Sequence, residues 1–406
     1  MTRQYIFTER AHLMCPNMYF GIVETINSIS DVNEITLAFQ KLSKAHPFLR
    51  ALLGYEKEKN QYYYDITDDS QIEIIWKDTE VSSIYDRMVF EEYERQTRRD
   101  WNLFQEGMLK AVCFQMQDKT CVLFIFHHLL ADGRAALELA LEFAHVCAEE
   151  SEPETVTEQL IASQEDLPKG SGLSGISRLL IRNCNRKWEK EDHFVTYEKY
   201  HEFVDAFLQQ DKVVHSVQMY QQEKLDRIAL SCRKNNISIN DFLLAKMCIE
   251  ENTHKIIIAQ DIREKLDCYK KGALGNYSTA FSIVCKTKST DILTEAKRIH
   301  KVVRKNLANT QMTMTVLSCY AQMAPGLIDA AAISALGGFQ SRAGAFVGSN
   351  MFGFRSGNGY SITNLGKYED TSVESAMFIP PASPAMKKIL GVLTMNGKMT
   401  ICSSQR

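Results

Sequence analysis

An apolar run that ends on two histidines constrains the fold of this chain more than any other feature. Residues 120–126 (Thr-Cys-Val-Leu-Phe-Ile-Phe) predict a β-strand, and a similar run at 109–116 precedes it across three polar residues that suit a hairpin turn. His127 and His128 follow the second run. After a short loop, Asp132 and Gly133 lead into an alanine-rich segment at 135–148 that favours a helix. The pattern predicts a strand–loop–helix unit.

The two histidines are candidates for acid–base chemistry. Side chains alternate along a strand, so we expect His127 and His128 to point in opposite directions, which lets one of them leave the core for a cleft. Neutral imidazole is the usual general base near neutral pH. The residues alone leave two simpler interpretations open, a satisfied core histidine and an Asp132 that only caps the next helix. A metal site is disfavoured, because adjacent strand residues face apart and cannot easily share an ion.

Periodicity elsewhere predicts an α+β protein. Helices are expected at 31–45, 87–99, 178–190, 223–233, 238–250 and 292–307. Further strands are expected at 19–26, 62–66, 72–76, 256–259, 278–285, 360–363 and 389–396. Residues 149–172 are acidic and contain few large apolar side chains. We therefore expect a first lobe over residues 1–150, a linker over 151–175 and a second lobe over 176–406.

Composition narrows the classes of function. The 406 residues carry a formal net charge of -3, which argues against a dedicated nucleic-acid binder. The 11 cysteines show no Cys-x-x-Cys spacing, so we expect a reduced, cytoplasmic protein without a zinc framework. No signal-peptide core and no apolar run long enough to span a membrane is present, so no transmembrane segment is expected. The basic helix at 178–190 is interpreted as a solvated face, with a phosphate or membrane contact as the alternative.

The stretch from His127 to Gly133 resembles the His-His-x-x-x-Asp-Gly signature of peptide-synthetase condensation domains. The same signature marks their relatives: chloramphenicol acetyltransferase, polyketide-associated acyltransferases, wax ester synthases and alcohol acetyltransferases. Weaker likenesses follow in the expected order at 46–51, 101–110, 238–245, 261–263 and 275–277. The resemblance spans nearly the whole chain and is nearest to stand-alone alcohol acetyltransferase or polyketide-associated members.

The resemblance implies a role for each residue of the motif. His128 would be the general base. Asp132 would belong to the catalytic motif without contacting substrate, because it would form an ion pair with Arg263 that holds the loop. His127 would be structural, and Gly133 would allow close backbone approach near the reacting thioester. The implied fold is a V-shaped pseudodimer of two chloramphenicol-acetyltransferase-like lobes, with the active site in a tunnel between them.

A second motif offers candidates for binding substrate or the oxyanion. Residues 360–366 resemble the Ser-Asn-Leu-Gly stretch of the alcohol- and wax-ester-forming relatives, which makes Thr363 and Asn364 candidate hydrogen-bond donors. An ordinary turn after a strand is the alternative. The Asp-Phe-Gly-Trp-Gly string of other branches is missing, and the nearest fragment is at 351–355.

These features together predict an acyltransferase. An acyl group would pass from acyl-CoA or a phosphopantetheinyl acyl-carrier protein to a hydroxyl or amine of a small or lipid-like acceptor. No covalent enzyme intermediate, bound cofactor or metal is expected, and the protein is expected to be a monomer. ATP use is not expected, because no Walker A loop is present. A non-catalytic, partner-recruiting protein and a thioester hydrolase on the same fold remain alternatives.

Overall fold

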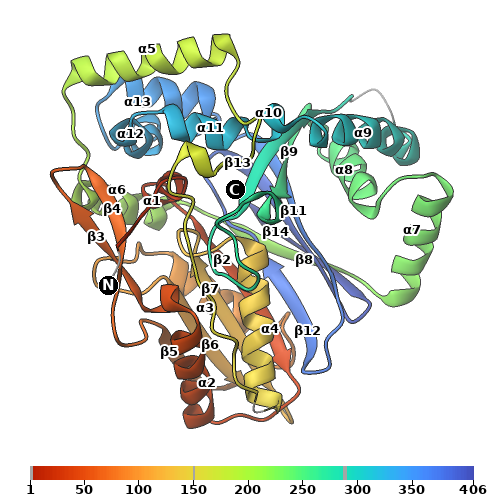
Figure 1. Ribbon diagram of the computed structural model, residues 1–406. Coiled ribbons are helices and arrows are strands. Elements are labelled where there is room, and N and C mark those ends of the chain that lie inside the picture. Colours follow the sequence, from red (N-terminus) through yellow and green to blue (C-terminus); the bar gives the residue numbers. More distant parts are fainter. Residues whose placement is uncertain (1–2, 150, 287–289) are drawn as a thin grey trace.

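The computed structural model describes residues 3–149, 151–286 and 290–406. The chain forms two lobes, each built on its own mixed sheet with helices packed against it (Figure 1). This arrangement confirms the α+β, two-lobed fold expected from the sequence. The boundaries predicted at residues 150 and 175 stay predictions.

The sheet of the first lobe has five strands. Its order is β12 (Val373–Ile379), β2 (Tyr19–Ile26), β7 (Thr120–His127), β6 (Leu109–Gln115) and β5 (Glu73–Glu80). All neighbours are antiparallel except β5 and β6, which are parallel. The edge strand β12 comes from near the end of the chain, so the late sequence completes the sheet of the first lobe.

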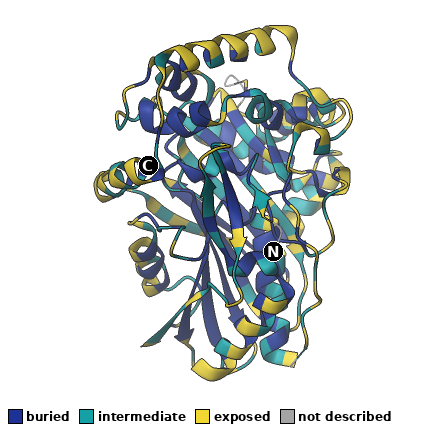
Figure 2. Ribbon diagram, turned by 60° about the vertical axis from the view of Figure 1, so that its left-hand side comes forward, coloured by how far each residue is buried: buried dark blue, intermediate teal, exposed yellow. Residues whose placement is uncertain are grey.

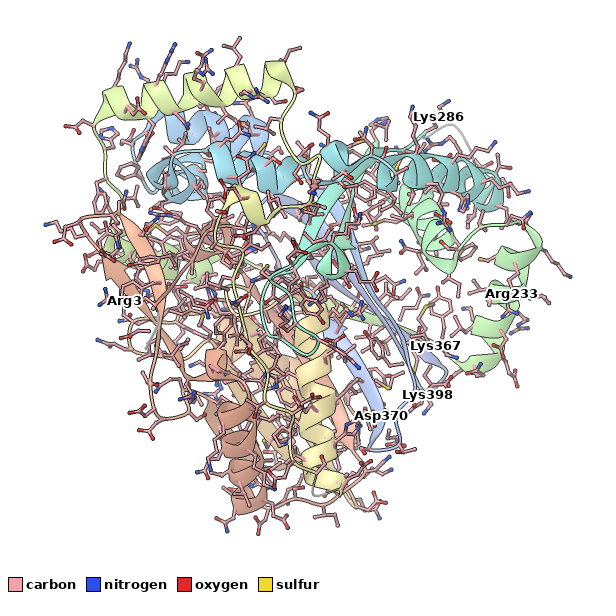
Figure 3. All side chains as sticks on the ribbon, viewed as in Figure 1. Arg3, Arg233, Lys286, Lys367, Asp370 and Lys398 are labelled. Atoms are coloured by element: carbon pink, nitrogen blue, oxygen red, sulfur yellow. The ribbon has the colours of Figure 1, made fainter. Side chains whose placement is uncertain are left out.

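The sheet of the second lobe has six strands. Its order is β10 (Ser278–Val284), β9 (Lys255–Asp261), β11 (Gly359–Tyr368), β13 (Met386–Met395), β14 (Lys398–Gln405) and β8 (Val214–Tyr220). The ends of β11 and β14 carry Lys367 and Lys398 at the outer edge of the molecule, near Asp370 (Figure 3). A third, small sheet consists of β1 (Gln4–Tyr5), β4 (Gln61–Ile66) and β3 (Ala51–Glu56).

Helices cover both faces of the first sheet. The three longest are α2 (Val32–Ala45), α3 (Arg87–Thr97) and α4 (Gly133–Glu149). Phe124 of β7 packs its ring against Phe143 of α4, whereas Gly21 of β2 lies against Tyr93 of α3. Even-numbered side chains of β7 therefore face α2 and α4, and odd-numbered side chains of β2 face α3. This alternation places His127 and His128 on opposite sides of the sheet.

Further helices follow α4 along the chain. They are α5 (Gly175–Glu191), α6 (Tyr197–Gln210), α7 (Gln222–Lys234), α8 (Ile239–Glu250), α9 (Ile292–Leu307), α10 (Thr310–Thr313), α11 (Thr315–Gln322), α12 (Pro325–Ala335) and α13 (Arg342–Phe346). The basic helix α5 lies across α11 and α13 with most of its outer face exposed (Figure 2). Within the described ranges, no single helix could cross a membrane by length and composition. The α11–α12 pair passes that test only together, with a bend of 109°.

Candidate active site

The backbone around the two histidines is held from both sides. The amide of His127 donates to the carbonyl oxygen of Met108 at 2.9 Å, and the amide of His128 donates to that of Met18 at 2.7 Å. His128 thus stands just beyond the end of β7, between strand and loop. A residue held at a strand end has the positional precision that proton transfer requires.

Asn276, from the second lobe, fixes the tautomer of His128. The Asn276 Nδ2 group donates to the carbonyl oxygens of His128 and Leu129 at 2.9 and 3.0 Å. That orientation turns Oδ1 toward the His128 Nδ1 atom, 3.0 Å away. Because Oδ1 only accepts hydrogen bonds, Nδ1 must carry the proton. The lone pair of His128 therefore lies on Nε2, which is the atom able to accept a proton.

A further histidine stacks on the candidate base. His12 lies in the short helix α1 (Arg10–Leu13), and its ring is 4.3 Å from that of His128 with an interplanar angle of 9°. Phe20 meets the His128 ring edge-on at 5.2 Å. Burial lowers the pKa of His128, and burial together with the neighbouring His128 lowers the pKa of His12. Both imidazoles are therefore neutral near pH 7, which is the state a general base requires.

His127 occupies a closed environment on the other side of the sheet. Its Nδ1 atom accepts the backbone N–H of Leu129 at 3.1 Å, and its ring packs edge-on against Tyr19. Burial lowers the pKa of His127 to about 3. A neutral histidine that holds its own loop fits the structural role expected from the sequence.

Asp132 and Arg263 form a buried ion pair across the two lobes. The Asp132 Oδ1 atom lies 2.6 Å from Arg263 Nη2 and also accepts the N–H groups of Arg134 and Ala135, both at 3.1 Å. Its Oδ2 atom accepts the N–H of Tyr277 at 2.9 Å. The carboxylate thus caps α4 and pairs with Arg263 at once, both through Oδ1, and it fixes the strand that follows Asn276.

Gly133, Thr363 and Asn364 gather around a small cavity next to this ion pair. The cavity measures about 150 Å³, and Asp132 and Arg263 line it as well. A Cβ atom on Gly133 would lie 3.0 Å from Leu365 Cδ2, so protein side chains occupy the room that glycine leaves. Thr363 is half-buried, and the exposed Asn364 accepts the N–H of Gly366 at 3.0 Å. The structure thus brings both residues to the motif loop, and their role toward an oxyanion stays a prediction.

A second, larger cavity shares no lining residue with the first. It measures about 370 Å³, and His12 forms part of its wall. Strands β9 and β10 line both cavities through side chains that share one face of the sheet. The cross-strand pair Asp261–Ser278 lines the small cavity, and the pair Ile257–Ser282 lines the large one. The two cavities therefore lie one after the other along the same wall between the lobes.

A metal ion and a cysteine nucleophile have less support among the residues that the structure describes. No group of three or more His, Cys, Asp or Glu side chains among those residues is arranged to hold a metal ion. Cys15 lines the large cavity, and burial raises the pKa of its thiol to about 12. A thiol with that pKa is protonated near pH 7 and is a poor nucleophile.

Two residues of the site were not among the sequence-predicted candidates. Asn276 stood out only as part of a Gly-Asn turn, and His12 carried no signal at all. Both contacts join segments more than 100 residues apart, at 148 residues for Asn276 and His128. A one-dimensional pattern cannot report such pairs. The only available signal for Asn276 was its place in the weak likeness at 275–277.

Comparison with known proteins identifies the fold. No protein-family model matches the sequence, and no curated protein matches it. Among solved structures, the epimerization domain from the third module of tyrocidine synthetase B aligns with a TM-score of 0.59 and 14% identity, covering 100% of this chain and 91% of that one. Polyketide synthase associated protein 5 from Mycobacterium tuberculosis aligns with a TM-score of 0.57 and 15% identity, covering 100% and 92%. The condensation domain of the Monacolin K polyketide synthase gives 0.59 and 10%, covering 100% and 92%.

The chain therefore has the fold of condensation domains and their relatives, over its whole length. This confirms the recognition made from the His-His-x-x-x-Asp-Gly motif at the level of fold. At such low sequence identity, the alignments carry no information on substrate, because one fold can support many activities.

Proposed function

We propose that this chain transfers an acyl group from a pantetheine thioester to a hydroxyl or amine, with His128 as the general base. One observation carries the proposal: His128 is a neutral imidazole whose free lone pair is assigned to Nε2 by Asn276, a residue of the second lobe. One cavity is lined by His12, which stacks on His128, and the other by Asp132, which lies on the same loop as His128. Two separate cavities of this kind suit a reaction in which two substrates approach from different directions.

The proposed reaction proceeds in two steps. The acceptor oxygen or nitrogen attacks the thioester carbonyl carbon while His128 Nε2 takes its proton, which forms a new C–O or C–N bond and a tetrahedral oxyanion. The C–S bond then breaks, and the imidazolium returns the proton to the departing thiolate. General base catalysis of this kind contributes about 10²–10⁴-fold to the rate. Thr363 and Asn364 are the proposed donors to the oxyanion.

The donor class follows from the same chemistry. Acyl-CoA and a phosphopantetheinyl acyl-carrier protein present the same thioester, and both are proposed donors. No covalent acyl-enzyme is needed, which agrees with the raised thiol pKa of Cys15. Asp132 and Arg263 act in this scheme by holding the loop that carries the base.

A product assay tests the proposal. The parent chain, His128→Ala and the surface control His193→Ala are incubated with acetyl-, octanoyl- and hexadecanoyl-CoA, or with the matching acyl-carrier proteins, and with a pool of alcohols and amines. We expect thiol release that depends on acceptor, with a matching acylated product by mass, in the parent and in His193→Ala. His128→Ala should lose at least 10²-fold of that rate.

Each other outcome rejects part of the scheme. Thiol release without an acceptor and without an acylated product would make the chain a thioester hydrolase. Equal rates in the parent and His128→Ala would remove His128 as the base. No thiol release and no acylated product with either kind of donor would favour a non-catalytic protein that recruits a partner.

A further inference from the structure

The large cavity, whose lining includes the stacking partner of His128, is built mostly from apolar side chains. Its volume of about 370 Å³ lies within the range of about 300–1,000 Å³ that ligand pockets occupy. Aliphatic, aromatic and thioether groups dominate its wall, including Met14, Met18, Ile257, Phe281, Phe352 and Met386. Lys255 is the only charged side chain of the lining. Such a wall offers few hydrogen-bond partners to a polar ligand, whereas an apolar ligand that binds there has its surface removed from water.

The cavity is lined by elements of both halves of the chain. His12 and Met14 approach from the first lobe, Ala280 faces it from β10, and Ala332 faces it from α12. Helix α1 is fixed on α12 by the buried ion pair between Arg10 and Asp329, with N···O distances of 2.9 and 2.6 Å. The wall is therefore held in place by a contact that does not involve the ligand.

The cavity adjoins the candidate base through one of its lining residues. His12 lines the cavity and stacks on His128. The small residues Ala280 of β10 and Ala332 of α12 line the cavity from two separate elements. A ligand that fills the cavity therefore reaches from the neighbourhood of the base into an apolar space without other catalytic groups.

We propose that this cavity binds an aliphatic chain of the substrate, with its reacting end toward His12 and His128. The inference rests on the proposed acyl transfer and adds its substrate class. At about 30 Å³ for each water-sized group, the cavity holds on the order of ten methylene groups. The chain belongs either to the acyl donor or to the acceptor, since both present the same apolar surface to the wall. A chain of about eight to twelve carbons fits the volume.

Binding measured without turnover tests the inference. Titration calorimetry on the parent and on His128→Ala uses two ligand series, acyl-CoAs from acetyl to hexadecanoyl and n-alkanols from ethanol to dodecanol. Affinity should rise about fourfold for each added methylene in one series and stop rising near ten carbons. The series that responds identifies the source of the chain. His128→Ala should bind like the parent, so a failure of catalysis leaves this result intact.

Variants that fill the cavity from two independent walls supply the second test. Ala280→Leu and Ala332→Leu should each weaken binding of the ten-carbon ligand at least tenfold and move the plateau to shorter chains. Val284→Leu is the matched control, because Val284 is exposed on the same strand as Ala280 and lies outside the cavity lining. Circular dichroism checks each fold. Affinity that ignores chain length in both series, or parent-like binding in a folded cavity-filling variant, would overturn the proposal.

Discussion

The amide of Asn276 is held at both ends, and this decides which nitrogen of His128 can take a proton. Its Nδ2 group is committed to two carbonyl oxygens of the motif loop, so only Oδ1 can face the imidazole. The same contact places the second lobe directly on the loop that carries His128. The orientation of His128 therefore depends on the two lobes keeping their relative position.

Removing this amide should impair catalysis more than substrate binding. We expect Asn276→Ala to lower kcat about 10–100-fold, because the imidazole can then rotate or adopt the other tautomer, with little change in KM. Steady-state kinetics against the parent measure the split. A loss confined to KM would show that Asn276 binds substrate and does not position the base.

At the scale of single elements, one carboxylate organises the turn from β7 to α4. Asp132 receives three backbone N–H groups and the Arg263 guanidinium, although both residues are less than a tenth exposed. Taking two charges out of water is costly, so the arrangement is stable only while both partners are present. The loop that bears His128 is thereby tied to the second lobe.

Breaking this pair should destabilise the whole chain. Asp132→Ala leaves Arg263 buried with only Asp261 as its charged partner, and we expect the free energy of unfolding to fall by about 3–5 kcal/mol. The control Glu138→Ala removes a half-exposed ion pair with Arg134 on the same helix and should cost less than about 1 kcal/mol. Chemical denaturation measures both, and similar losses in the two variants would contradict this account.

Local signals in the sequence were sufficient for many elements. The helix predicted at 31–45 is α2, with Asp31 and Glu34 forming the reciprocal cap, and the helix predicted at 292–307 has those same bounds. Strand 19–26 and the hairpin of β6 and β7 are also confirmed. The two helices follow from helical periodicity and a capping residue, and the hairpin follows from two apolar runs on either side of a polar turn.

Elements that depend on distant partners were not predicted. Strands β8, β12 and β14 and helix α6 received no prediction of their own. Strand β12 pairs with β2, more than 340 residues earlier in the chain, as in the register of Met377 with Val23. Most side chains of β8 are not buried, so the hydrophobic pattern is weak there. The site shows the same division. His128 and Asp132 lie in one contiguous motif, and Arg263 was expected from the family resemblance. His12 and Asn276 join the site only through tertiary contacts.

At the scale of the whole molecule, the segment between the lobes is packed and does not hang free. Glu158 is buried, accepts the backbone N–H groups of Phe48 and Leu274, and contacts His46 Nδ1 at 2.9 Å. The other ring nitrogen of His46 lies 2.7 Å from Glu142. One histidine between two carboxylates thus joins α2, α4, the connecting segment and the loop that leads to Asn276.

This cluster predicts a pH dependence of stability. Burial opposes the charge on His46, but hydrogen bonds to Glu142 and Glu158 prevail and raise its pKa from 6.5 to about 9. A raised pKa in the folded state stabilises the protein fully below pH 6.5, and this contribution is lost as the pH rises through 9. The contribution is about 3 kcal/mol at most. Denaturation between pH 6 and 10 should show this decline in the parent, and His46→Gln should remove it; the same slope in both would exclude His46 as its source.

The pH dependence of kcat/KM tests the central claim most directly, since it reports the protonation of the free enzyme's base. Burial lowers the pKa of His128, so the neutral, active form should persist below pH 6.5, and activity should fall only in more acidic solution. Asn276→Asp places a carboxylate on Nδ1, which favours the imidazolium, and should move this acidic limb to higher pH. An acidic limb that does not move in Asn276→Asp, or activity that rises as His128 becomes protonated, would contradict His128 as the general base.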